Sequence, residues 1–110
     1  MSLIEISKKY FKTFSNKDLS GLQEMFSKEI KLRDWEIEAT GLEEVLKTYK
    51  NIFESVDNIK VKPLDIYNDN DTVVAELDID INNGQKTLLV VDIIQFDNNG
   101  KIIDIRAYEG

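Results

Sequence analysis

Two aspartates occupy positions that share a strand face with apolar residues. In "IKLRD" at residues 30–34, side chains alternate between the two faces of an expected strand, so Asp34 lies on the side of Ile30 and Leu32. Asp92 lies in "LLVVDIIQF" at residues 88–96, where both faces are otherwise apolar. Both carboxyl groups are therefore expected to face the interior.

These acids suggest proton-transfer chemistry when they are taken together with one tyrosine. Desolvation raises the pKa of a buried carboxyl, so Asp92 is expected to stay protonated near neutral pH and to donate a hydrogen bond. Tyr10 lies near the middle of an apolar helical stripe and supplies a second donor. An ionised Asp34 as base, with Tyr10 and Asp92 as donors to an oxyanion, would suffice to enolise a ketone.

Each residue also has an ordinary structural interpretation. An acid in a strand pattern is often found at a strand end, at a bulge or on an exposed edge. A tyrosine in an apolar stripe often belongs to the core, with its hydroxyl reaching the surface or a backbone partner. The chemical hypothesis therefore depends on the three side chains meeting in one cavity.

Composition excludes several other kinds of function. The chain has no histidine and no cysteine, which removes imidazole bases, thiol nucleophiles and the usual zinc sites. Its 21 acidic and 14 basic residues give a net charge of −7, which argues against nucleic acid and anionic membranes as partners. The N-terminal residues lack the apolar run of a signal peptide, so a cytoplasmic location is expected.

The first half of the chain has helical periodicity. Apolar residues recur every three or four positions over residues 3–14, and Asp18 is placed to cap a short second helix over residues 19–26. After the strand that contains Asp34, Thr40 and Glu43 have the spacing of a capping box. They predict the start of an amphipathic helix that reaches about residue 56.

The second half changes to strand periodicity. Strands are predicted at residues 72–81, 86–96 and 101–108, joined by turns at 82–84 and 97–100. A further strand at residues 59–67 contains Pro63, which indicates a sheet edge or a bulge. Residues 1–110 are thus expected to form a single α+β domain, in which a curved sheet of antiparallel strands wraps around helices.

The motifs resemble those of the ketosteroid isomerases. Tyr10 is followed eight residues later by Asp18 in "KDLSG", and Asp34 follows sixteen residues after that. The segment "VVDIIQFDNNGKIIDIRAY" then supplies Asp92 ahead of a turn and an "RA" strand. The resemblance covers nearly the whole chain. It implies the fold of the superfamily that includes nuclear transport factor two and the SnoaL-like polyketide cyclases, a cone-shaped, mostly antiparallel sheet wrapped around N-terminal helices.

The resemblance implies a steroid delta-isomerase type of reaction without a metal or organic cofactor. Asp34 would be the base, and Tyr10 and Asp92 would form the oxyanion hole. The ligand would be a small apolar ketone, and the family forms homodimers through the outer face of the sheet. The expected cavity lining consists of Phe14, Leu32, Trp35, Phe53, Val90 and Ile94.

Two alternatives stay open at this point. Arg33 and Arg106, the only arginines, could belong to an Asp-Arg-Asp arrangement like that of the epoxide hydrolases in the superfamily, although alternation puts Arg33 opposite Asp34. The domain could also be a non-catalytic module that binds a small apolar ligand or serves as a dimerising scaffold. Trp35 stands where the isomerases have a proline, at the expected mouth of the pocket.

Overall fold

Three helices lie in the first half of the chain, as predicted. The computed structural model describes residues 1–110 and contains α1 (Leu3–Ser15), α2 (Leu19–Met25) and α3 (Leu42–Ser55). Helix α1 begins with a capping box between Ser2 and Glu5. Helix α2 begins at Asp18, whose carboxylate accepts a hydrogen bond from the Gly21 amide at 3.0 Å. The predicted cap at Asp18 is confirmed.

The start of α3 differs from the prediction. Its N-cap is Gly41, which has a φ of 91° and provides no side-chain cap, so Thr40 and Glu43 do not form a capping box. Thr40 instead ends a short strand, β2 (Glu38–Thr40), and pairs there with Lys31. Because strand pairing holds Thr40, the glycine makes the turn from strand to helix.

One six-stranded sheet contains all the strands. Its other members are β1 (Phe26–Arg33), β3 (Ile59–Asp69), β4 (Thr72–Ile81), β5 (Lys86–Phe96) and β6 (Ile102–Glu109). The strand order is β2-β1-β6-β5-β4-β3, and only the β1–β6 pair is parallel. Strand β3 forms one edge, with a register shift between Pro63 and Asp65, as the proline predicted.

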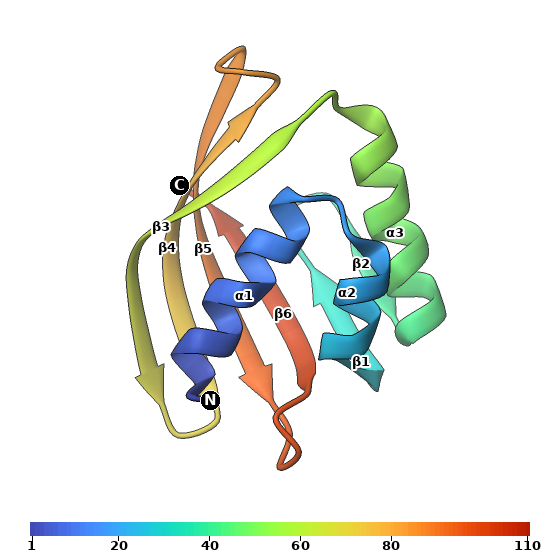
Figure 1. Ribbon diagram of the computed structural model, residues 1–110, viewed down its shortest axis with the longest axis vertical. Coiled ribbons are helices and arrows are strands. Elements are labelled where there is room, and N and C mark those ends of the chain that lie inside the picture. The colour runs from blue at the N-terminus through green and yellow to red at the C-terminus, as the bar shows by residue number, and fades with distance from the viewer.

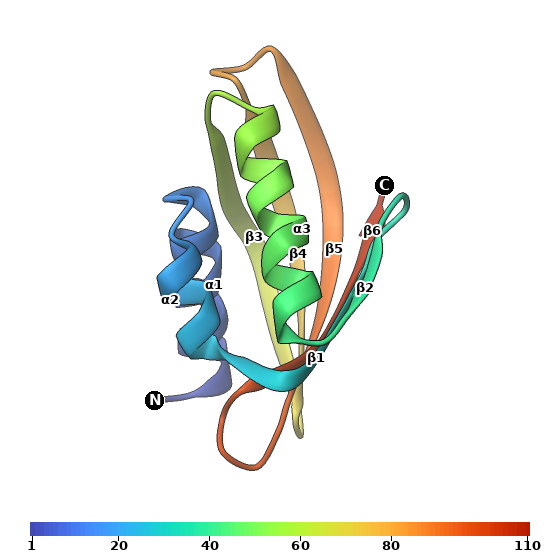
Figure 2. The same cartoon turned by 90° about the vertical axis from the view of Figure 1, so that its right-hand side faces the viewer.

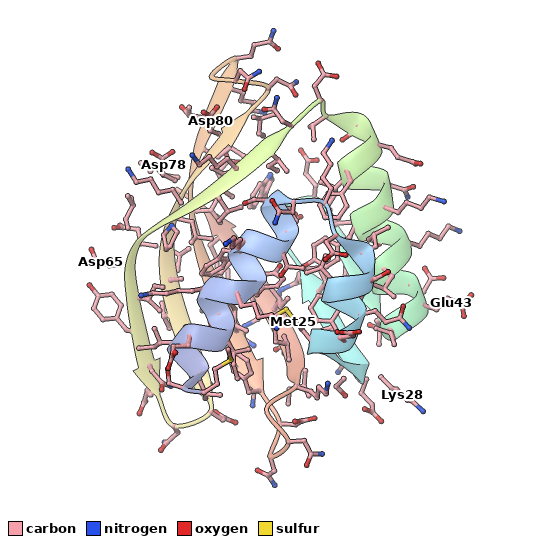
Figure 3. All side chains as sticks on the ribbon, viewed as in Figure 1. Met25, Lys28, Glu43, Asp65, Asp78 and Asp80 are labelled. Atoms are coloured by element: carbon pink, nitrogen blue, oxygen red, sulfur yellow. The ribbon has the colours of Figure 1, made fainter.

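The sheet curves around the helices and stays open. Figures 1 and 2 show all three helices on its concave side, with β5, β6 and β1 bending around α3. In Figure 3, Met25 lies near the middle of the molecule while Glu43 points from α3 into solvent. The opposite face of α3 buries Val45, Tyr49 and Phe53. The α+β architecture with its curved sheet is as predicted.

The convex face of the sheet has no helix over it, as Figure 2 shows. Leu89 of β5 is 58% exposed there and Tyr108 of β6 is 48% exposed. None of the three helices combines the length and the apolar character needed to cross a lipid bilayer.

Candidate functional site

A cavity of about 230 Å³ lies between the helices and the concave face of the sheet. Tyr10 of α1, Asp34 after β1 and Asp92 of β5 all contribute to its wall. Twenty residues line it, and the three that are not hydrophobic are the acids Asp34, Glu36 and Asp92. The three residues singled out in the sequence therefore do meet in one largely apolar cavity.

Asp34 is fixed by the loop that follows β1. The strand ends at Arg33, and Oδ1 of Asp34 then accepts hydrogen bonds from the backbone amides of Glu36 and Ile37, both at 2.7 Å. The Asp34 amide donates to the Ile37 carbonyl at 2.9 Å and closes the turn. Oδ2 has no hydrogen-bond partner within the protein, so one carboxylate oxygen remains available to a ligand.

Asp92 is the most deeply placed acid of the site. Only 8% of the residue is exposed; no hydrogen bond joins its carboxyl to another residue, and the carboxyl oxygens keep some accessible surface. Its strand partners are Ala75 of β4 and Ala107 of β6, whose small side chains leave space beside it. Burial, and secondarily the negative charge of Asp34, raise the pKa of Asp92 to about 7. The group can therefore carry a proton at neutral pH.

Tyr10 has a partner that the sequence did not indicate as a site residue. Its hydroxyl lies 2.6 Å from that of Tyr49 on α3, and both residues are buried and line the cavity. Burial is the largest cause that raises the pKa of each phenol, so both stay protonated. Tyr49 lies in the apolar stripe of its helix just as Tyr10 does. A second tyrosine on a helix that faces the same sheet was the feature of the sequence that could have marked Tyr49 as a site residue.

Four of the six predicted lining residues are found in the cavity wall: Phe14, Leu32, Trp35 and Val90. Phe53 and Ile94 are not, which corrects the prediction. The Phe53 ring packs against Phe14 at 5.1 Å between centroids and stacks on Tyr49 at 6.1 Å, so it belongs to the core behind the wall. Ile94 lies further along β5, opposite Val73, and both are fully buried.

A sequence model of the SnoaL-like domain matches residues 8–105. The chain belongs to this family. No curated protein sequence matches it. The SnoaL-like family is part of the superfamily of proteins like nuclear transport factor two, which agrees with the fold described above.

Solved structures share the fold at low sequence identity. A candidate SnoaL-like polyketide cyclase from Shewanella denitrificans has a TM-score of 0.87 and 13% identity, covering 98% of this chain and 90% of its own. An LEH-like epoxide hydrolase from M. tuberculosis has a TM-score of 0.85 and 16% identity over 98% and 82% of the two chains. A candidate ketosteroid isomerase from Kribbella flavida has a TM-score of 0.83 and 12% identity over 96% and 76%.

Neither arginine of this SnoaL-like domain reaches the cavity. Arg33 donates from Nη2 to the Tyr108 hydroxyl at 3.0 Å, and its guanidinium lies 6.0 Å from the centre of the Tyr108 ring. Arg106 forms an ion pair with Asp104 two residues away. An Asp-Arg-Asp arrangement at the cavity is thus absent, and no three acidic residues are grouped so that they could hold a metal ion.

Proposed function

We propose that this protein is a cofactor-independent isomerase of the ketosteroid isomerase type. The observation that carries the proposal is the convergence of a carboxylate with a free oxygen, a buried carboxyl with a raised pKa and a pair of phenols on one apolar cavity. Such an arrangement supplies a base and an oxyanion hole together.

Asp34 is the proposed base. Its free Oδ2 removes a proton from the carbon next to the substrate carbonyl. The electron pair of the broken C–H bond forms a double bond to the carbonyl carbon, and the π pair of the carbonyl moves onto its oxygen, which gives a dienolate. The protonated Asp34 then returns the same proton to the γ-carbon of the dienolate, which gives the α,β-unsaturated ketone. The two amide hydrogen bonds to Oδ1 hold the carboxylate in one orientation through both steps.

Tyr10 and Asp92 are the proposed oxyanion hole. The Tyr10 hydroxyl donates to the developing oxyanion while it accepts from Tyr49, because a hydroxyl can donate and accept at once. The protonated carboxyl of Asp92 donates to the same oxygen. In a cavity lined mainly by apolar side chains, these hydrogen bonds stabilise negative charge more than they would in water.

The Asp34→Asn variant tests the proposal. Asparagine keeps an Oδ1 that can accept the two amide hydrogen bonds but removes the base, so isomerisation of β,γ-unsaturated ketones should fall by about 10²–10⁴-fold with little change in ligand affinity. Solvent deuterium uptake at the carbon next to the carbonyl, followed by NMR, measures the same step.

Asp97→Asn is the matched control. Oδ1 of Asp97 also accepts two backbone amides, from Asn99 and Lys101, both at 2.9 Å, but in a hairpin that does not line the cavity. This variant should keep full activity. If the wild type binds enones but neither isomerises them nor exchanges their protons, the domain is the non-catalytic ligand-binding module instead.

We also propose that the protein is a homodimer packed through the convex face of the sheet. The support is the apolar row that β5 presents on this face, which comprises the exposed Leu89 and the half-buried Val91 and Ile93, with the exposed Tyr108 of β6 beside it. Outward-facing charges flank this row with opposite signs, basic on β1 at Lys31 and Arg33 and acidic on β4 at Glu76 and Asp78.

A further inference from the structure

The size of the cavity limits the ligand that it can enclose. A dry apolar cavity of about 150 Å³ holds benzene, so a cavity of about 230 Å³ encloses roughly nine non-hydrogen atoms on the same scale. Ligand pockets usually have volumes of about 300–1,000 Å³ and bury most of the ligand surface. This cavity is therefore small, and a compound with four fused rings, roughly twice as large as the enclosed volume, would extend well outside it.

The charges on the wall limit the ligand in a second way. Every charged residue of the wall is acidic, namely Asp34, Glu36 and Asp92, and no lysine or arginine is present to pair with a ligand anion. A carboxylate or phosphate on the ligand would be desolvated beside these acids, at a cost that nothing in the wall offsets. Anionic ligands are thus disfavoured.

The exposed residues of the cavity wall lie in the loop after β1. Trp35, which is 43% exposed, and the exposed Glu36 are both wall residues, whereas Tyr10, Tyr49 and Asp92 are all buried. A ligand whose oxygen meets the buried hydroxyl and carboxyl groups therefore has its far end directed toward this loop and the half-buried Leu88.

We propose that the substrate is a neutral cyclic enone of one or two rings, bound with its carbonyl oxygen on Tyr10 and Asp92. This inference rests on the proposed function for the enone group, while the limits on size and charge come from the cavity wall alone. It predicts that each ring inside the cavity adds affinity and that rings beyond the second, which lie in solvent, add none.

A series of neutral phenols tests the size limit by binding alone, because a phenol carries an oxygen on a flat ring as a dienol does. Affinities of phenol, 2-naphthol and a tetracyclic phenol would be measured by calorimetry on the wild-type protein. Affinity should rise about tenfold or more from phenol to 2-naphthol and then change by less than about threefold. A tetracyclic phenol that binds more than about tenfold tighter than 2-naphthol overturns the proposal, as does the absence of saturable binding by every phenol.

Two neighbouring leucines of β5 provide a matched pair of variants. Leu88 lines the cavity, whereas Leu89 points to the convex face. Leu88→Ala enlarges the cavity and should raise the affinity of the tetracyclic phenol relative to 2-naphthol by about threefold or more, while Leu89→Ala leaves the ratio unchanged. Equal effects of the two substitutions would contradict the assignment of Leu88 to the ligand.

Charge is tested with 2-naphthamide and 2-naphthoate, which share a ring system. The anion should bind at least about tenfold more weakly than the amide, and equal affinities would contradict the proposal.

Isomerisation of monocyclic, bicyclic and tetracyclic β,γ-enones completes the test. If the phenol series levels off at two rings but no enone reacts, the proposed function fails and the size limit stands; if enones react while affinity keeps rising, the size limit fails.

Discussion

The charge of the Asp92 carboxyl decides whether the cavity can stabilise an oxyanion. Burial raises its pKa to about 7, about 3 units above an ordinary aspartate. Its carboxyl carbon resonance, assigned by comparison with Asp92→Asn, should therefore titrate near neutral pH. Isomerase activity should fall as the pH rises through this value because the donor loses its proton. A midpoint near pH 4 would exclude Asp92 as a donor.

The raised pKa of Asp92 also makes the free energy of unfolding depend on pH. The folded protein binds the Asp92 proton more tightly than the unfolded chain does. Protonation of Asp92 therefore adds to the free energy of unfolding, and this addition is fully present below about pH 4 and is lost as the pH rises through about 7. The free energy of unfolding of the wild type should fall relative to that of Asp92→Asn by roughly 1.4 kcal/mol for each pH unit within this window. Urea denaturation at pH 5 and pH 8 measures the difference.

The two phenols are predicted to contribute unequally. Tyr10→Phe removes the proposed donor to the oxyanion and should reduce kcat by about 10²-fold or more. Tyr49→Phe leaves that donor in place but removes the hydroxyl 2.6 Å behind it, and should reduce kcat by about tenfold with KM nearly unchanged. If Tyr49→Phe is the more damaging change, Tyr49 is the residue that contacts the substrate.

Sequence alternation identified the acids better than it identified the cavity wall. Asp34 and Asp92 interrupt apolar patterns, so their types alone drew attention to them. The apolar patterns of α3 and β5 include Tyr49, Phe53 and Ile94 without interruption. Periodicity specifies which side of a helix or strand is buried, but not whether a buried side chain faces the packed core or a cavity. The hydroxyl pair and the limits of the cavity therefore required the three-dimensional structure.

Among the elements, the turn from β2 into α3 depends on one glycine. Gly41 has a φ of 91° and a ψ of 150°, a conformation that is nearly confined to glycine, while a Cβ built on it meets no atom within 4 Å. Gly41→Ala should therefore lower the free energy of unfolding by about 1–3 kcal/mol through backbone strain alone. Denaturant unfolding measures the change.

Thr40→Ala is the control for this prediction. If Thr40 capped α3, its removal would cost about 1 kcal/mol, but the side chain makes no cap hydrogen bond, so the change should be about 0.5 kcal/mol or less. A larger loss from Thr40→Ala than from Gly41→Ala would show that the helix starts as the sequence pattern first indicated.

Strands were predicted well where long runs of strand-forming residues are bounded by turns of asparagine and glycine. The bounds of β4 and β5 agree with the alternation and with the "NNG" turn, in which Asn82, Asn83 and Gly84 all have positive φ. Strand β2 has three residues, too few to show a period, and its pairing with β1 displaced the expected capping box. The parallel pairing of β1 with β6 is a long-range contact that no local pattern encodes.

The convex face of the sheet is predicted to form the dimer interface. With a two-fold axis along β5 and β6, the acidic β4 of one subunit lies opposite the basic β1 of the other. Ile93→Asp places a charge within the apolar row and should convert the protein to a monomer in sedimentation experiments.

Leu64→Asp is the control for the dimer. Leu64 is an exposed apolar residue of the edge strand β3, where it is 45% exposed, and it is not part of the row on β5. This variant should sediment as the wild type does. A wild-type protein that is monomeric at high concentration would show that the convex face has no self-partner.

Trp35 is the only tryptophan of the chain, and it lies at the wall of the cavity with 43% of its surface exposed. The protein therefore contains an intrinsic optical probe of its own binding site. A ligand that enters the cavity should shield the indole, shift its fluorescence to shorter wavelength and protect it from quenching by acrylamide. Unlabelled protein could be screened against collections of metabolites in this way, so that the search for the natural substrate need not begin with an assay for any particular reaction.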